Sequence, residues 1–96
     1  MKPSTALDLQ RIAVRAVARR FQMGNLRVFG SVAMGTDTEG SDLDLLVDPK
    51  PGTTLFDLGG LQVELEELLG VTVDLRTPED IPLKFRQQVL EQSRPV

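Results

Sequence analysis

Asp42 and Asp44, two aspartates separated by one leucine, are the residues of this sequence best suited to chemistry. Side chains alternate along a strand, so both carboxylates point to one face while Leu43, Leu45 and Val47 point to the other. Like charges held so close repel each other, and the carboxyl pKa values rise unless a cation is present. The spacing therefore predicts a divalent metal ion bound between Asp42 and Asp44.

Asp74 repeats this pattern in a second apolar stretch, residues 71–76. If that stretch pairs beside the first strand, its carboxylate joins Asp42 and Asp44 on one open face. The chain contains no histidine and no cysteine, so carboxylates are the available ligands, and they suit Mg²⁺ or Mn²⁺. Two such ions, about 3.5–4 Å apart, can hold both the attacking and the leaving oxygen of a phosphoryl transfer.

Gly30 and Ser31 are residues of the types that bind phosphate. They follow the apolar residues 26–29 and precede a predicted helical turn over residues 32–35. Glycine lets the backbone approach phosphate oxygens closely, and the amides of the turn and the serine hydroxyl can donate hydrogen bonds to them. The turn and the aspartate pair are weak signals separately, but together, in two predicted strand contexts, they indicate a phosphate-transferring site.

Each of these residues also has a purely structural interpretation. Asp42 and Asp44 could be surface carboxylates, although aspartate is disfavoured in strands and two in one short strand need a reason. Asp74 has weaker context because it stands alone in its strand. Ser41 is expected to shape its loop, Arg76 and Lys50 to be exposed charges that could reach phosphate, and Asp37, Glu39 and Asp48 to be ordinary loop acids.

The elements that must position these residues follow in the order helix, strand, turn, strand, helix, strand, helix. We expect helices from an N-cap at Thr5, with Asp8 in the capping-box position, to about Phe21, from an N-cap at Thr54 to Leu69, and from Thr77 to about Gln92. Residues 23–25 are expected to form a turn, and strands are expected at residues 26–29, 42–48 and 71–76. This order predicts a small α/β domain with a mixed sheet of three to four strands flanked by helices.

The first and second long helices have different polar patterns. In the first, one face carries apolar residues at helical spacing and another carries arginines, which we interpret as a solvated face, with a docking surface for an acidic partner as the alternative. The apolar set comprises Leu9, Ile12, Ala13, Ala16 and Val17, and the arginines are Arg11, Arg15 and Arg19. In the second, Leu58, Leu61, Leu65, Leu68 and Leu69 are expected to face the core.

Length and charge limit the remaining possibilities. The 96 residues predict a single domain spanning residues 1–96. A net charge of -3, no Trp and no Tyr argue against direct nucleic-acid binding, which depends on phosphate neutralisation and base stacking. No apolar run of membrane-spanning length and no secretion signal are visible, so we expect a cytoplasmic protein without a membrane partner.

The sequence resembles the nucleotidyltransferase superfamily that includes DNA polymerase beta, in residues 28–35 (VFGSVAMG) and 41–47 (SDLDLLV). Its short length and the VDL strand at residues 73–75 are similar to the minimal nucleotidyltransferase branch. The resemblance implies that Gly30 and Ser31 hold the nucleoside triphosphate and that Asp42 and Asp44 ligate Mg²⁺, with two ions expected. It also implies that Asp74 completes the metal site and helps to deprotonate or orient the acceptor hydroxyl.

The same resemblance implies a biological role. Many members of this branch are antitoxins paired with a HEPN-domain ribonuclease toxin, and some inactivate the toxin by transferring AMP from ATP to a tyrosine hydroxyl. We therefore expect a protein adenylyltransferase in a hetero-oligomer with such a toxin. Relatives often carry arginine where this chain has Met34. The alternatives are a non-catalytic antitoxin that masks its partner by contact, and a small-molecule acceptor, for which the chain looks too short.

Overall fold

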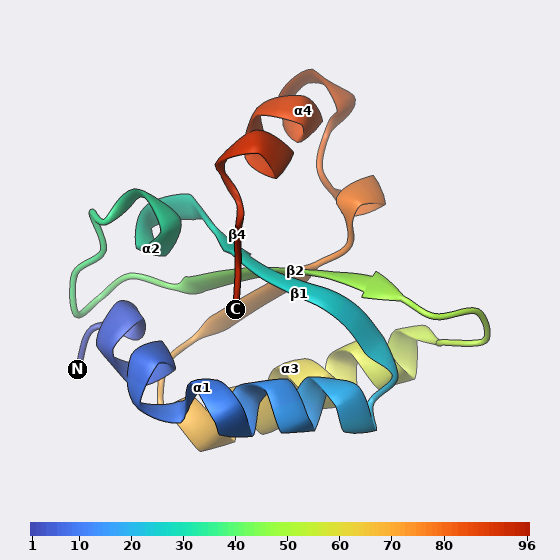
Figure 1. Ribbon diagram of the computed structural model, residues 1–96, viewed down its shortest axis with the longest axis horizontal. Helices are drawn as coiled ribbons and strands as arrows, with labels where there is room; N and C mark the ends of the chain where they lie inside the picture. The colour runs from blue at the N-terminus through green and yellow to red at the C-terminus, as the bar shows by residue number, and fades with distance from the viewer.

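A computed structural model describes residues 1–96 as one mixed four-stranded sheet with helices on both sides (Figure 1). The strand order is β3-β2-β1-β4, with β1 antiparallel to both β2 and β4 and β2 parallel to β3. The predicted α/β class and the mixed sheet are thereby confirmed. The elements are α1 (Pro3–Arg20), β1 (Met23–Phe29), α2 (Gly30–Met34), β2 (Leu43–Pro49), α3 (Leu55–Leu69), β3 (Val73–Arg76), the 3₁₀ turn η1 (Pro78–Asp80), α4 (Leu83–Gln92) and β4 (Arg94–Pro95).

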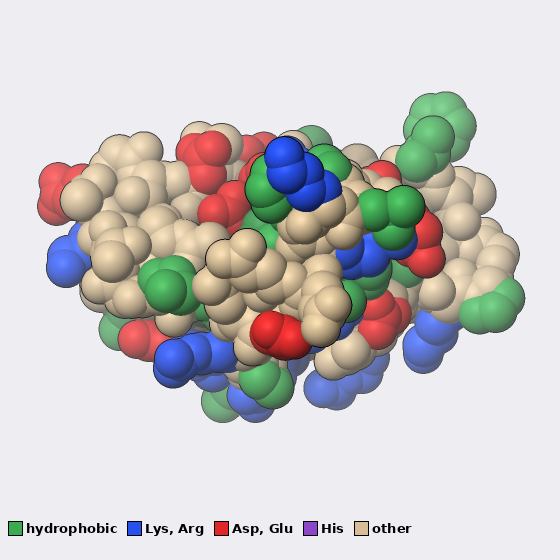
Figure 2. Space-filling view, turned by 90° about the horizontal axis from the view of Figure 1, so that it is seen from above, with side chains coloured by type: hydrophobic (Ala, Val, Ile, Leu, Met, Phe, Trp, Pro, Cys, Tyr) green, Lys and Arg blue, Asp and Glu red, His purple; other side chains and the backbone are tan.

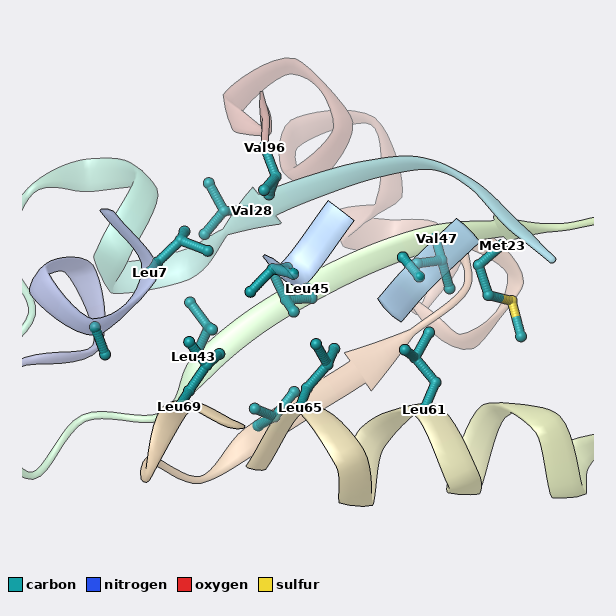
Figure 3. Close-up of a cluster of buried hydrophobic side chains, with 14 of the residues drawn as sticks. Leu7, Met23, Val28, Leu43, Leu45, Val47, Leu61, Leu65, Leu69 and Val96 are labelled. Carbon is teal, nitrogen blue, oxygen red and sulfur yellow. The ribbon is translucent and has the colours of Figure 1, made fainter. Parts of the chain in front are cut away.

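The helices α1 and α3 lie next to each other across one face of the sheet, whereas α2 and α4 lie toward the other side (Figure 1). The core fills the space between the sheet and the α1–α3 layer. Leu43, Leu45 and Val47 of β2 point into it, and Leu61 and Leu65 of α3 meet them there, all fully buried (Figure 3). This is the apolar side predicted from the alternation along β2. Each such leucine contributes about 1.5–3 kcal/mol through burial.

The second long helix has the ends that its sequence predicts. The Thr54 hydroxyl accepts a hydrogen bond from the Asp57 backbone nitrogen, and the Asp57 carboxylate accepts one from the Thr54 nitrogen, so the two residues form a capping box. Gly70 ends the helix in the left-handed region with φ of 69°. The predicted apolar set also faces the core, because Leu61, Leu65 and Leu69 are buried and the other two leucines are partly buried against them.

The first helix begins earlier than predicted, and the Thr5 cap is wrong. Lys2 is the N-cap residue, Pro3 occupies the first turn, and no side chain of the helix itself caps it. A distant residue does so: Asp37, from the loop after α2, accepts a hydrogen bond of 2.9 Å from the Ser4 backbone nitrogen. Asp37 is itself buried, so it is a structural carboxylate rather than the ordinary loop acid that its position predicts.

The apolar face assigned to this helix is also wrong. Leu9 and Ile12 are 68% and 81% exposed and Ala16 is exposed too, while the buried residues are Pro3, Ala6, Leu7, Val14 and Ala18. The backbone of Gln10 leaves the helical region (φ -121°, ψ 19°), so the helix is kinked there and no single helical period runs through it. Beyond the kink, Val14 and Ala18 face the core in place of Ile12 and Ala16.

Residues 23–25 are not a turn but the start of β1. The reversal is completed at Gln22, which has φ of 60°, and Met23 is already buried. The strand then has an irregularity between Gly24 and Arg27, where Asn25 takes φ of 49°. The asparagine that indicated a turn serves this irregularity instead, since asparagine is one of the residue types that tolerate positive φ.

The C-terminal segment departs most from prediction. Pro82 separates η1 from α4, so residues 77–92 do not form one continuous helix. The chain then returns to the sheet as β4, a strand that the sequence did not predict, and Val96 is buried in the core. Arg11 and Arg15 donate hydrogen bonds to the main-chain oxygen of Val96, so two of the three arginines in the predicted solvated stripe fasten this segment. No helix has the length and apolarity required to cross a membrane.

Candidate functional site

Gly30 lies where β1 ends and α2 begins, directly against the carboxylate of Asp44. Phe29 pairs with Asp44 across the β1–β2 ladder, and Gly30 adopts φ of 67°. A Cβ atom on residue 30 would lie 2.1 Å from Asp44 Oδ2, so the Asp44 carboxylate would have to shift to make room for any side chain there. Both the backbone conformation and this close approach therefore favour glycine at position 30.

The turn after Gly30 is the short helix α2, as predicted, and Gly35 ends it with φ of 74°. The Gly35 nitrogen donates to the Val32 carbonyl, and the Thr36 nitrogen donates to the Ser31 carbonyl at 2.9 Å. The Ser31 side chain makes no hydrogen bond within the chain and is half-buried beside the start of the turn. Its hydroxyl is therefore available to a ligand.

The three predicted acids lie at the same end of neighbouring strands. Asp42 is exposed just before β2, and Asp44 is half-buried at the second position of that strand. Asp74 of β3 is the direct partner of Asp44 in the parallel ladder, which confirms the predicted pairing of the two strands. Asp44 thus stands between Gly30 on one side and Asp74 on the other.

Asp44 is the most perturbed of these acids. Its pKa is raised to about 6, first by burial and then by the neighbouring charges of Asp74 and Asp42, while the Arg76 charge opposes this rise. Its carboxylate accepts no hydrogen bond from any group of the chain, so the Arg76 charge is the only group of the chain that favours its ionised form. A carboxylate in this environment gains most from a bound cation.

Arg76, which the sequence predicts to be an exposed charge, is bonded to one of the three acids. Its Nε atom donates to both carboxylate oxygens of Asp74, at 3.1 and 3.3 Å, and this contact raises the pKa of Arg76. The signal was present in the sequence, because residues two apart in a strand point to the same face. Lys50, in contrast, follows β2 at the end of the strand farther from Asp42 and Asp44.

With Asp74 held by Arg76, the chain contains no cluster of three or more acidic side chains close enough to hold a metal ion together. Asp42, Asp44 and Asp74 therefore share one end of the sheet without forming a ready three-carboxylate cage. Their chemistry still fits a hard divalent ion, because all donors are carboxylate oxygens and the central one has no other partner. Asp42 and Asp44 have no hydrogen-bond partner in the chain, whereas Asp74 already accepts from Arg76 Nε.

The site is an open face rather than a deep pocket. Leu46, on the same side of β2 as Asp44, is fully buried, and η1 with the buried Ile81 packs against that part of the strand. The hollow beside α4, of about 440 Å³, contains none of the predicted site residues. Seen from the α4 side, basic, acidic and hydrophobic side chains are interspersed (Figure 2).

A mixed sheet that places a glycine–serine turn beside paired acids on adjacent strands defines a nucleotidyltransferase-type α/β domain. Comparison with known proteins agrees with this class. The chain belongs to the nucleotidyltransferase domain family, whose sequence profile matches residues 11–96. It is accordingly a nucleotidyltransferase.

The most informative relatives are archaeal. The chain is 39% identical over 66 residues to a Methanocaldococcus jannaschii protein assigned as a protein adenylyltransferase, covering 69% of this chain and 71% of that protein. It is 33% identical over 78 residues to the protein adenylyltransferase MntA of Thermococcus cleftensis, covering 81% of this chain and 79% of that protein.

Solved structures give the same fold. A structure assigned to the minimal nucleotidyltransferases superimposes with a TM-score of 0.87 at 42% identity, covering 97% of this chain and 95% of that one. A chain from a toxin–antitoxin crystal structure with AMP-PNP superimposes with a TM-score of 0.73 at 24% identity, covering 85% of this chain and 68% of that one. The second likeness concerns the fold alone.

Proposed function

We propose that this chain transfers AMP from ATP to a hydroxyl group of a partner protein. The observation that carries the proposal is the placement of Asp44 between Gly30 and Asp74, with Asp42 at the start of the same strand. A phosphate-binding turn and metal-binding acids must lie side by side for phosphoryl transfer, because the reacting phosphorus has to meet both. The archaeal relatives named as protein adenylyltransferases support the choice of AMP and of a protein acceptor.

Each site residue has a part in this proposal. The backbone of the turn that begins at Gly30 and the Ser31 hydroxyl hold the phosphate chain, since the hydroxyl has no hydrogen-bond partner within the chain. Asp42 and Asp44 hold Mg²⁺, which when bound neutralises charge on the phosphates. Asp74, on the neighbouring strand, orients the acceptor hydroxyl and receives its proton.

The proposed partner is a HEPN-type ribonuclease toxin, with this chain as its antitoxin. The resemblance to the minimal nucleotidyltransferase branch supports this partner, and the chain with the same fold in a toxin–antitoxin crystal structure is consistent with it. The openness of the site is consistent with a protein acceptor, because an open face lets a hydroxyl on the surface of a folded partner approach. A non-catalytic antitoxin is the second candidate, favoured by the engagement of Asp74 with Arg76.

Intact-protein mass spectrometry of the co-expressed partner tests the proposal. Wild type and an Asp42→Ala, Asp44→Ala double variant are compared with ATP and Mg²⁺, and Glu67→Ala, which removes an exposed acid on α3, serves as the matched control. We expect the partner to gain one or more AMP masses with wild type and Glu67→Ala and none with the double variant.

The complex itself must be measured in the same samples. Equal binding of the partner by all three proteins, without any mass gain, would leave the masking antitoxin as the function. A mass gain that persists in the double variant would remove Asp42 and Asp44 from the mechanism.

A further inference from the structure

Arg76 is positioned in the site but uses only part of its hydrogen-bonding capacity. Its Nε atom contacts Asp74, while neither terminal nitrogen donates a hydrogen bond to any group of the chain. A guanidinium presents five N–H donors in a planar fork, and it loses its hydration more readily than an ammonium does. Four of these donors are therefore unused in a side chain that is 42% exposed.

No other cation of the chain serves this end of the sheet. Arg76 is the only basic residue whose charge acts on Asp44. Most of the remaining arginines are committed elsewhere: Arg27 pairs with Asp48, Arg20 pairs with Glu64, and Arg86 donates to the Glu79 and Ile81 carbonyls. The three acids of the site thus face a single positive charge supplied by the protein.

The single positive charge of Arg76 affects how a nucleoside triphosphate can bind at this end of the sheet. A triphosphate brings several negative charges to a face that already carries three carboxylates, and Mg²⁺ offsets only part of them. The Nε edge of Arg76 is occupied by Asp74, but the edge formed by its two terminal nitrogens is free. That free edge matches the spacing of two phosphate oxygens, which is the bidentate geometry that arginine forms best.

We propose that Arg76 is a substrate-binding residue that joins Asp74 to the phosphate chain of the nucleotide. It holds the acceptor-side carboxylate through Nε and the phosphates through its terminal nitrogens, so that the two reacting partners share one rigid support. This inference rests on the proposed function and deepens it, since it assigns a phosphate contact to a residue outside the Gly30–Ser31 turn.

The test measures nucleotide binding rather than transfer. ATP binding with Mg²⁺ is followed by isothermal titration calorimetry, and adenosine binding is followed by NMR titration, for wild type, Arg76→Gln, Arg76→Lys and Arg19→Gln. The last variant removes the same charge from an exposed arginine on α1, on the other side of the sheet. Thermal unfolding verifies that all four proteins are folded.

We expect Arg76→Gln to weaken ATP binding about tenfold, as loss of a hydrogen-bonded charge contact does, without changing adenosine binding. Arg76→Lys should recover part of the loss, because it restores the charge but not the fork. Arg19→Gln should match wild type.

Equal ATP binding by wild type and Arg76→Gln would overturn this inference and leave the proposed function standing. An equal loss in Arg76→Gln and Arg19→Gln would overturn it as well, since net charge alone would then explain the effect. A parallel loss of adenosine binding would assign Arg76 a structural role only. Failure of wild type to bind ATP would overturn the inference and the proposed function together.

Discussion

Asp37 and Asp44, seven residues apart, are both withdrawn from solvent, yet their environments act in opposite directions. Asp37 accepts a hydrogen bond from the first turn of α1, and this backbone contact with Ser4 lowers its pKa. Asp44 accepts none, and burial beside two other acids raises its pKa to about 6. The fold supplies a hydrogen-bond donor to Asp37, whereas Asp44 has no hydrogen-bond partner within the chain.

This difference in pKa distinguishes a carboxylate that stabilises the fold, Asp37, from one that belongs to the candidate site, Asp44. A helix N-terminus stabilises a negative charge, so an ionised Asp37 favours the folded state. An ionised Asp44 opposes it, because the folded chain supplies burial and repulsion without compensating donors. A protein retains such an unfavourable charge where binding depends on it. Substitutions at Asp37, Asp44 and the two nearby glycines test this contrast.

The largest effect is expected for activity. Asp44→Asn should reduce AMP transfer at least about 100-fold, because an amide cannot hold a divalent ion as a carboxylate does and such charge stabilisation is worth several kcal/mol. Asp37→Asn should leave the rate within about twofold while the protein is folded. Partner modification over time by mass spectrometry gives both rates. Comparable losses in the two variants would contradict the division of roles.

Two glycines test the packing around Asp44. Gly30→Ala should destabilise the fold by about 2–3 kcal/mol, since it combines a positive φ with a clash against the Asp44 carboxylate. Gly35→Ala has nearly the same φ but open space around it, so its cost should be about 1 kcal/mol. Urea unfolding of both variants measures the difference. Equal losses would mean that the Asp44 side chain can move aside at no cost.

Asp44 should also make metal-free stability depend on pH. The pKa of Asp44 is higher in the folded than in the unfolded chain, so its contribution to stability decreases as the pH rises from about 4 to 6 and remains lowered above that. Asp44→Asn should therefore stabilise the metal-free protein at pH 8 by about 1 kcal/mol, a value reduced for partial solvent screening. At pH 4 the two proteins should unfold alike. Unfolding by urea at both pH values, with a chelator present, measures this crossover.

Asp37 should give a smaller effect of opposite sign. Its pKa is lowered in the folded state, so its contribution is present at neutral pH and is lost as the pH falls through the folded pKa. Asp37→Asn should lower the melting temperature at pH 7 by a few degrees, and this difference should disappear in strong acid. Calorimetry across that range tests it. A difference that persisted unchanged at low pH would show that charge is not the cause.

The short-period patterns of β2, β3 and α3 were predicted well from the sequence, whereas that of α1 was not. Alternation along β2 placed Leu43 and Leu45 in the core and Asp44 on the other side, and it predicted that β3 would present Asp74 in the same way. The leucine spacing of α3 and its capping residues were equally readable. These features are local, so a few neighbouring residues specify them.

The features that escaped prediction depend on contacts between distant residues or on one irregular backbone position. Nothing around Asp37 indicates that it caps a helix 33 residues away in the chain. The helix is kinked at Gln10, and the helical period that placed Ile12 in the core does not hold across that kink. The spacing of Asp74 and Arg76 in the sequence places their side chains on the same face of β3. Charged side chains on an edge strand are usually solvated, however, so the sequence alone could not show that Arg76 bonds to Asp74.

The strand β4 determines when this domain can become complete. It follows all the other elements of this domain in the sequence, but it pairs with β1, which is synthesised early, and it brings Val96 into the core (Figure 3). Domains fold as their residues leave the ribosome, at about 5–20 residues per second. Until residues 94–96 emerge, one side of β1 has no strand beside it and the core lacks a side chain. The nascent protein therefore passes through an interval in which its sheet can recruit another chain, and that interval closes only at the end of this segment.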